Sequence, residues 1–314
     1  MMPLIDIFFN LGILIAGFFI VGKSSELIVY SFTDYARKLG LSVYMLGFTA
    51  ISLTSIMPGF IAALTGAQLN LGGVVFGTVL GSNLFKIPLL GIILLAGKKV
   101  KNDTNAIGGA PIMTLFLTVL PFVLSADNSL DMGDGLILTI AYILYLYSFL
   151  HSFKLGKAKG MINSSMVYKD ILIFFGTLMA LLISARFLID SSMNIAELFE
   201  VPAYLTVLII MGAATSLPEL IYEFKTVVNE NGKLSLGYIH GIIVANSTLV
   251  LGITSFLMPI TIDFKLIFPM GIFLIIGTIL SIVLINKEEL NWKHGTIFIG
   301  FYIAYLLTEI IILS

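Results

Sequence analysis

The feature that most constrains this chain is a series of ten apolar segments, each long enough to cross a lipid bilayer as a helix. A bilayer core needs roughly 20 apolar residues per helix. The segments span 5–30, 42–65, 72–96, 107–125, 135–153, 169–190, 203–227, 235–258, 264–286 and 293–313. Only 11% of the 314 residues are charged, against about a quarter in soluble domains. The sequence therefore predicts an all-α integral membrane protein with ten transmembrane helices.

The same composition excludes several function classes. The chain has no cysteine, which rules out disulfides, thiolate catalysis and cysteine-based metal sites. No basic tract could neutralise a phosphate backbone, so nucleic acid is not an expected partner. No Lys or Arg precedes Lys23, and the first segment is therefore interpreted as a membrane helix rather than a cleaved signal peptide. Two of the three histidines fall in loops and no catalytic pairing lies within the helices, so neither an enzyme nor a cofactor is expected.

The distribution of Lys and Arg predicts the orientation in the membrane. Numbering the gaps between segments from one to nine, the odd gaps and their edges carry most of the cationic residues. They hold Arg37, Lys38, Lys98, Lys99, Lys101, Lys154, Lys157, Lys159, Lys169, Lys225, Lys233, Lys287 and Lys293. The even gaps carry only Lys265. Because cytoplasmic loops attract Lys and Arg, we expect both termini outside, in the plasma membrane of a prokaryote.

An internal repeat divides the chain into two halves. A shift of 160 residues superimposes glycines and prolines, which shape the backbone, without a gap. The matched pairs are Pro58 with Pro218, Gly72 with Gly232, Gly77 with Gly237 and Gly81 with Gly241. Five helices per half is an odd number, so the second half enters from the opposite side, as in inverted-repeat transporters. We expect a first repeat at 1–153, a cytoplasmic linker at 154–168 and a second repeat at 169–314.

Two polar interruptions, at 49–59 and 212–219, lie at corresponding positions of the two halves. Pro58 and Pro218 predict helix breaks, because proline lacks an N–H and frees backbone carbonyls. Such backbone is tolerated in a membrane only where it faces protein or a watery cavity.

The interruptions also supply oxygen donors, which Na⁺ and Ca²⁺ prefer. The candidate ion ligands here are Ser55, Thr215, Ser216 and Glu219. A plain kinked helix, with its hydroxyls bonded to their own turn, is the competing interpretation and is favoured for Ser55 taken alone. Glu219 is different, because a carboxylate in the bilayer interior is costly and marks a functional site by default. It is the candidate metal ligand.

The neighbouring segments 72–96 and 235–258 complete the predicted site with Ser82, Lys86 and Asn246. Lys86 precedes Lys98 by about twelve residues, or roughly 18 Å of helix. Its stem cannot reach the membrane surface over that distance, so Lys86 needs an internal partner, and Glu219 is the obvious acid. A structural ion pair without a transport role is the alternative.

Other polar residues are assigned more peripheral roles. His240 and Glu223 are candidate pathway residues, although a lone histidine is more often a satisfied polar contact and Glu223 could be solvated at a helix end. Arg186, Glu309 and Lys23 lie near segment ends and are interpreted as interfacial anchors.

These features together resemble the cation/calcium antiporter superfamily, the sodium/calcium exchangers and their relatives. The motif of its broken helix matches A-T-S-L-P-E at 214–219, and the motif of its following helix matches G-I-I-V-A-N-S-T-L-V-L-G at 241–252. The first repeat is degraded, with G-S-N-L-F-K-I-P-L-L-G at 81–91 and T-S-I-M-P-G at 54–59. The resemblance covers essentially the whole chain and implies ten helices in two inverted halves, with a central cluster of ions and one glutamate from each half.

The departures from that pattern concern charge. Gly59 stands where the resemblance implies the second glutamate, and Lys86 places an ammonium at a ligand position. Opposite charges 4 Å apart attract by about 4 kcal/mol at an effective dielectric constant of 20, and a Ca²⁺ beside Lys86 would be repelled by at least as much. This argues against tight Ca²⁺ binding in the usual mode. The ammonium of Lys86 could act as a tethered cation, or it could exchange a proton during the cycle.

Two functions are therefore weighed. The leading hypothesis is a secondary-active antiporter of inorganic cations (Na⁺, Ca²⁺ or H⁺) with altered ion selectivity or proton coupling. The alternative is a non-transporting membrane protein, with a binding or regulatory role, that retains the exchanger fold. The expected partners are these cations and the lipid bilayer, and the oligomeric state stays open.

Overall fold

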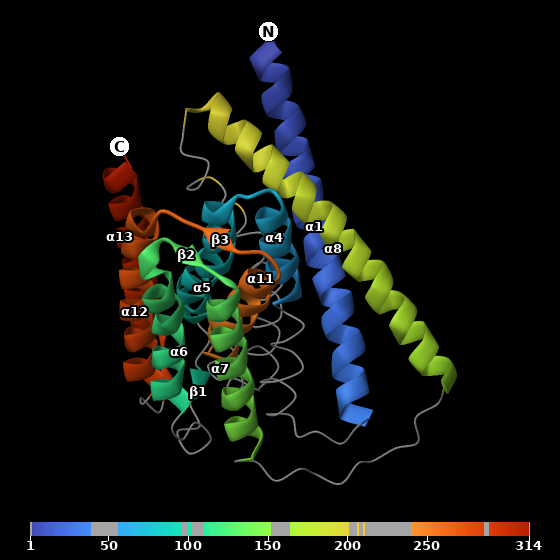
Figure 1. The fold of residues 1–314 in the computed structure, drawn as a ribbon, viewed down its shortest axis with the longest axis vertical. Helices are drawn as coiled ribbons and strands as arrows, with labels where there is room; N and C mark the ends of the chain where they lie inside the picture. Colours follow the sequence, from blue (N-terminus) through green and yellow to red (C-terminus); the bar gives the residue numbers. More distant parts are fainter. Residues whose placement is uncertain are drawn as a thin grey trace.

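The structure is a computed structural model of the chain. It describes residues 2–38, 56–95, 100–101, 110–151, 164–200, 240–285 and 289–313, together with positions 206 and 210. Within these residues almost all of the backbone is helical (Figure 1). Six described helices are long and apolar enough to cross a membrane, which agrees with the predicted all-α membrane class.

Two long helices, α1 (Met2–Lys38) and α8 (Ser164–Leu198), pack against each other beside the remaining helices (Figure 1). At 1.5 Å per residue, the 37 residues of α1 extend over about 55 Å, well beyond a hydrocarbon core of about 30 Å. Both helices therefore exceed the predicted apolar segments. They approach closely at Gly17, where a Cβ would lie 2.7 Å from Cδ2 of Leu188.

The other described helices form a bundle. They are α4 (Met57–Gln68), α5 (Gly72–Leu95), α6 (Ala110–Leu124), the 3₁₀ helix η3 (Ser125–Asp127), α7 (Met132–His151), the π-helix η4 (Ala245–Val250), α11 (Leu251–Leu257), α12 (Phe264–Ile285) and α13 (Trp292–Leu313). Residues 240–244 are helical and run directly into η4. Apart from the start of α4, the ends of these bundle helices lie within three residues of the predicted segments wherever the chain is described.

Two short antiparallel strand pairs tie the halves of the chain together. Strand β1 (Val100–Lys101) pairs with β4 (Glu289–Leu290), and β2 (Ser129–Leu130) pairs with β3 (Ile260–Thr261). Adding 160 to β1 gives β3, and adding 160 to β2 gives β4. In Figure 1, β2 and β3 lie near one end of the bundle and β1 lies near the other. The repeat found in the sequence thus reappears in the pairing of the backbone.

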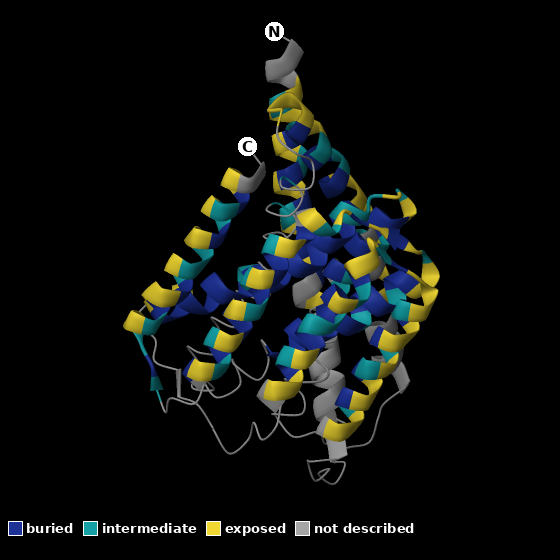
Figure 2. Cartoon of the chain, turned by 60° about the vertical axis from the view of Figure 1, so that its left-hand side comes forward, coloured by how far each residue is buried: buried dark blue, intermediate teal, exposed yellow. Residues whose placement is uncertain are grey.

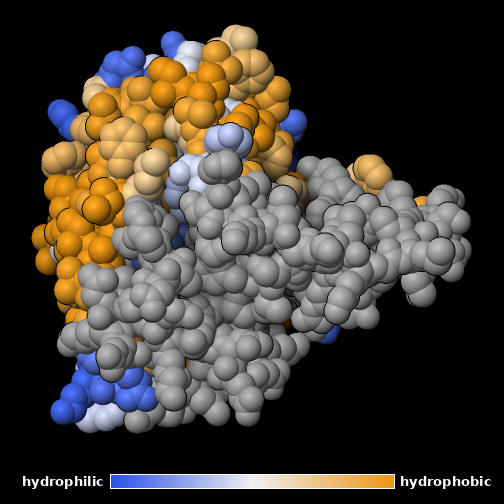
Figure 3. Space-filling view, turned by 90° about the horizontal axis from the view of Figure 1, so that it is seen from below, coloured by the Kyte–Doolittle hydropathy of each residue, from blue (hydrophilic) through white to orange (hydrophobic). Residues whose placement is uncertain are grey.

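The core of the bundle is formed by α5 and by the segment from His240 through α11. Most of α5 is buried, as is most of 240–257 (Figure 2). The outer helices instead expose large apolar side chains, such as Phe8 of α1 and Ile311 of α13. The described surface in Figure 3 is largely hydrophobic, as expected for a surface in contact with lipid. Polar residues buried in the centre are therefore the place to search for a site.

Candidate functional site: a buried polar cluster between α5 and η4

A cluster of polar side chains lies where α5 and η4 meet in the core. It consists of Ser82, Asn83 and Lys86 from α5 and Asn246 and Ser247 from η4. None of the five is more than 3% exposed. Buried polar groups are costly unless they are hydrogen-bonded, so the contacts within this cluster determine what it can bind.

The two asparagines lock each other's orientation. Asn83 directs Nδ2 at the carbonyl oxygen of Ile243 (3.3 Å) and at Oγ of Ser247 (3.1 Å). A carbonyl oxygen only accepts, so this side of the Asn83 amide must be the NH₂ group. Its Oδ1 then faces Asn246, which donates through Nδ2 at 2.9 Å. Since Asn246 Nδ2 also donates to Ser82 Oγ at 3.0 Å, both N–H bonds of each amide are committed.

This arrangement leaves one amide oxygen unused. Within the described part of the chain, Oδ1 of Asn246 accepts no hydrogen bond, whereas Oδ1 of Asn83 is taken. An amide oxygen is a ligand for hard cations. Asn246 is therefore the cluster member best placed to bind one.

The hydroxyl of Ser82, by contrast, is saturated. It donates to the carbonyl oxygen of Val79 at 3.0 Å and accepts from Asn246 at 3.0 Å and from Nζ of Lys86 at 3.4 Å. A hydroxyl has one proton and two lone pairs, so all three are in use. A cation could bind Ser82 Oγ only if Asn246 or Lys86 withdrew.

Lys86 is held inside the protein as the sequence requires. It is 2% exposed, and Nζ donates to the carbonyl oxygen of Ser82 at 3.2 Å as well as to its hydroxyl. Both contacts lie one helical turn back along α5. The ammonium therefore occupies oxygen atoms that a free cation would otherwise use.

The backbone at Asn246 is a π-helix. Residues Ala245–Val250 form η4, which continues into α11, whereas α5 is α-helical over the corresponding positions and includes Pro88. π-segments are rare and frequently occur at functional sites. The wider turn presents Asn246 and Ser247 together to α5, a geometry that the apolar periodicity of the segment does not predict.

The start of α4 lies against this region. Helix α4 begins at Met57 with Pro58 in its first turn, a position at which proline is tolerated because its N–H would be unsatisfied anyway. Gly59 is buried, and a Cβ placed there would meet no atom of the described residues within 4 Å. The described part of the chain thus leaves room at the position where the resemblance implies a glutamate.

Several predicted site residues lie outside the described residues, and their positions stay predictions. They are Ser55, Thr215, Ser216, Pro218, Glu219 and Glu223. The structure accordingly brings Ser82, Lys86 and Asn246 together, and does not describe the acid expected to pair with Lys86.

His240 lies six residues before Asn246 and is 3% exposed. Its Nε2 is 2.9 Å from Oγ of Ser281, whose own proton goes to the carbonyl oxygen of Thr278 at 2.8 Å. Nε2 must therefore carry the hydrogen and donate. This is the satisfied polar contact that the sequence offered as one reading of His240.

One expectation is wrong. Glu309 is not an interfacial anchor, because it is only 1% exposed. The inward face of α13 carries it into the protein while its neighbours Ile310 and Ile311 face outward. Arg186, in contrast, is exposed and pairs with Asp190 at 2.9 Å, as an anchor would.

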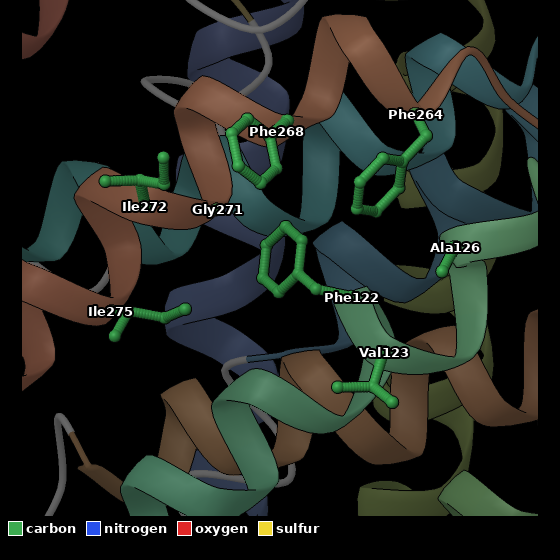
Figure 4. Close-up of a pocket in the computed structure, with 8 residues that line it drawn as sticks. All are labelled: Phe122, Val123, Ala126, Phe264, Phe268, Gly271, Ile272 and Ile275. Atoms are coloured by element: carbon green, nitrogen blue, oxygen red, sulfur yellow. The ribbon is translucent and has the colours of Figure 1, made fainter.

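A separate pocket of about 330 Å³ lies between α6 and α12. Figure 4 shows the rings of Phe122, Phe264 and Phe268 around it, with Gly271 and Ile272 of α12 alongside. Its lining offers no charged or polar side chain, so it is unsuited to bind an ion.

Sequence reasoning missed Asn83 and Ser247 as members of the cluster. Asn83 was visible as part of the G-S-N motif at 81–83, and Ser247 as the residue after Asn246. What the sequence could not supply was their contact, which joins positions 164 residues apart.

Known proteins resemble this chain in sequence and in fold. The chain matches the sodium/calcium exchanger protein family twice, over residues 9–151 and 169–311. These two matches are offset by 160 residues, the same shift that relates the strand pairs.

Relatives of similar length carry related names. The sodium/calcium exchanger MaX1 of Methanosarcina acetivorans is 24% identical over 95% of this chain and 97% of its own. The putative antiporter CaxA of Alkalimonas amylolytica is 26% identical over 76% of this chain and 78% of its own.

Two solved structures share the fold. The sodium–calcium exchanger NCX_Mj, soaked with Na⁺ and Sr²⁺, aligns with a TM-score of 0.71 and 20% identity over 96% of this chain and 98% of that one. The H⁺/Ca²⁺ exchanger CAX aligns with a TM-score of 0.78 and 17% identity over 95% and 82%. Together with the duplicated match and the apolar helices, these similarities place the chain in the sodium/calcium exchanger family of integral membrane proteins.

Proposed function

We propose that this protein is a secondary-active cation antiporter in which the ammonium of Lys86 takes the place of one bound cation. The observation that carries the proposal is the saturated Ser82 hydroxyl, which accepts from both Lys86 and Asn246. A fixed positive charge at this point changes which ions the site accepts, or couples the cycle to protons.

The architecture proposed with it is ten transmembrane helices in two inverted five-helix repeats, 1–153 and 169–314, joined by a cytoplasmic linker at 154–168. Three observations support it: the two strand pairs at opposite ends of the bundle, the 160-residue offset between them, and the same offset between the family matches. Both termini would lie outside, in the plasma membrane of a prokaryote.

The ligands of the transported cation would come from both repeats. Asn246 would contribute its unused amide oxygen, and Glu219 the carboxylate, with Thr215, Ser216 and Ser55 as hydroxyl ligands beside the helix breaks at Pro58 and Pro218. Ser82 would join only in a state in which Lys86 has moved or lost its proton. Glu223 would extend a polar pathway toward the cytoplasm, whereas His240 would keep its structural contact with Ser281.

Charge balance supports the altered selectivity. Gly59 removes one carboxylate from the site, and Lys86 adds one positive charge. A divalent ion next to an ammonium at about 4 Å meets repulsion of at least about 4 kcal/mol at a dielectric constant of 20. Na⁺ or H⁺ is thus favoured over Ca²⁺ as the ion that binds beside Lys86.

The direct test is counter-transport in proteoliposomes containing the purified full chain. An imposed Na⁺ or H⁺ gradient should drive movement of a second cation, and Lys86→Asn should change which ions are exchanged. Lys265→Asn serves as the matched control, because Lys265 is an exposed lysine and its replacement should leave selectivity unchanged. Absence of flux for every cation tested would refute the antiporter and favour a non-transporting member of the family.

A further inference from the structure

A second ionisable group is buried inside the protein and is not used by the Lys86 cluster. Glu309 of α13 is 1% exposed, and within the described part of the chain neither of its carboxylate oxygens has a hydrogen-bond partner. The Tyr305 side chain interacts with it from one turn away. An intramembrane ionisable residue of this kind is rare and costly.

The packing of α13 on α5 places a hydroxyl opposite this carboxyl. The helices run antiparallel and touch where Gly91 meets Gly295 and where the rings of Phe85 and Tyr302 lie 5.7 Å apart. Residues seven apart share a helix face, because seven residues make almost two turns. Seven residues back from Phe85 is Thr78, and seven residues on from Tyr302 is Glu309.

Thr78 is also a buried polar residue that lacks a hydrogen-bond partner among the described residues. It is fully buried at 0% exposure, and its Oγ1 has no hydrogen-bond partner within the described residues. The register of α5 and α13 puts these two buried polar groups at the same level of adjacent helices, although no hydrogen bond joins them in this conformation. A protonated carboxyl can donate to a threonine hydroxyl, which then still has its own proton to donate.

Among the described residues, the charged groups near Glu309 do not offer it an ion pair. On α5 the charged residue is Lys86, eight residues and about 12 Å of helix beyond Thr78. On α12 it is Lys265, which is exposed at the start of that helix. On α13 itself, Lys293 and His294 lie at the opposite end and the nearer titratable groups are Tyr302 and Tyr305.

A metal ion is a poor fit for the same surroundings. No group of three or more histidine or acidic side chains that could hold a metal occurs among the described residues. Hard cations require about six oxygen ligands, and one carboxylate with a few hydroxyls does not supply them. A proton needs only the carboxylate itself.

We propose that Glu309 is a proton-binding site buried inside the protein, separate from the Lys86 cluster, whose carboxyl group donates to the Thr78 hydroxyl once a side-chain rotation brings the two groups together. In the conformation described here the carboxyl holds its proton. When α13 and α5 separate and water enters, the O–H bond breaks, the proton passes to water and the carboxylate is left hydrated. The inference concerns proton binding and does not depend on which ion the chain transports.

The test is infrared difference spectroscopy of the purified full chain at neutral pH. The native protein should show the carbonyl band of a protonated carboxylic acid, and Glu309→Gln should remove that component. Glu197→Gln, at an exposed glutamate of α8, should leave it intact. Thr78→Val should shift the position of the band without removing it, because only the hydrogen bond is lost.

Thermal stability provides a second readout. Glutamine has nearly the shape and charge of a protonated glutamate, so Glu309→Gln should leave the melting temperature unchanged or raise it. Failure of this variant to fold, or a fall of its melting temperature by about 5 °C or more at neutral pH, would mean that Glu309 is ionised and would overturn the proposal. An unchanged carbonyl band in Glu309→Gln, or loss of the native band on adding Na⁺ or Ca²⁺, would overturn it as well.

Discussion

Lys86 and Asn246 occupy equivalent positions in the two halves of this chain, 160 residues apart, yet their hydrogen bonds within the polar cluster differ. Lys86 donates twice to Ser82 of its own helix. Asn246 donates across to the other helix and keeps an amide oxygen uncommitted. At these equivalent positions, one half supplies a positive charge and the other an uncharged amide.

The two helices also differ in shape. Helix α5 is α-helical throughout with Pro88 inside it, whereas the equivalent stretch of the second half is the π-helix η4. In contrast, the strand pairs of the two halves agree in register. The difference in helix type thus falls within the polar cluster in which α5 meets η4.

The largest expected effect comes from replacing Gly59 and Lys86 together, the two residues that depart from the exchanger pattern. In Gly59→Glu/Lys86→Asn, the first half regains a carboxylate and loses its ammonium, and the added side chain has room because a Cβ at Gly59 meets nothing within 4 Å. Relief of about 4 kcal/mol of repulsion corresponds to a fall of Kd for Ca²⁺ of nearly three orders of magnitude. Calorimetric titration would measure it, with Gly59→Glu alone expected to gain far less.

A smaller effect is expected from cutting the link between the halves. Asn83→Leu leaves the Ile243 carbonyl, the Ser247 hydroxyl and an Asn246 N–H without their partner. Unsatisfied buried groups cost about 1–3 kcal/mol each before relaxation, so we expect a loss of unfolding free energy of about 2–4 kcal/mol in a denaturation experiment.

The control for this change is Thr248→Val. Among the described residues, the Thr248 hydroxyl bonds only to the Val244 carbonyl of its own helix, at 2.6 Å, and the change should cost less than about 1 kcal/mol. Equal losses for the two variants would contradict the special role given to Asn83.

Cross-half helix packing can be compared through two glycines at equivalent positions, Gly135 of α7 and Gly295 of α13. A Cβ at Gly135 would lie 2.7 Å from the Gly252 carbonyl oxygen, and one at Gly295 would lie 2.7 Å from the Gly91 carbonyl oxygen. Each Gly→Ala change should therefore destabilise by about 1–3 kcal/mol. Gly300→Ala, where a Cβ meets nothing within 4 Å, should instead stabilise slightly. Melting temperatures of the three variants would show whether close helix packing or helix propensity determines the effect of each Gly→Ala change.

The smallest expected effect concerns the ion pair on the surface of α8. Arg186 and Asp190 are about half exposed, with side-chain exposures of 51% and 44%. Exposed pairs one turn apart contribute about 0.3–0.5 kcal/mol. Asp190→Asn should thus shift the melting temperature by less than any change above, and a large shift would mean that this pair is part of a wider network.

Much of the fold could be predicted from the sequence, because the lengths of the apolar segments indicate the helices and the spacing of the glycines indicates the repeat. The predicted segment 72–96 became α5 almost unchanged, and 293–313 became α13. Helices α1 and α8 run longer than predicted, to Lys38 and Leu198. The length of an apolar segment indicates only the part of a helix that crosses the bilayer, and these helices continue beyond it.

The site was harder to predict, since it depends on which helix faces which. The burial of Lys86 inside the protein could be predicted from its distance along the helix to Lys98, without knowledge of the residues that pack around it. The bonds of Asn83 to Ile243 and Ser247 depend on tertiary packing and on a π-turn that no periodicity signals. Glu309 was misjudged for the same reason, because its nearness to a segment end suggested solvent while α13 turns it inward.

The central claim is that Lys86 acts as a tethered cation, and ion-dependent thermal stability tests it most directly. Melting temperatures of the native chain and of Lys86→Asn would be measured in Na⁺, K⁺, Ca²⁺ and Mg²⁺ across a range of pH. The account predicts that Ca²⁺ leaves the native melting temperature nearly unchanged and raises that of Lys86→Asn. Equal stabilisation of both proteins by Ca²⁺ would contradict it, because the ammonium would then exclude nothing.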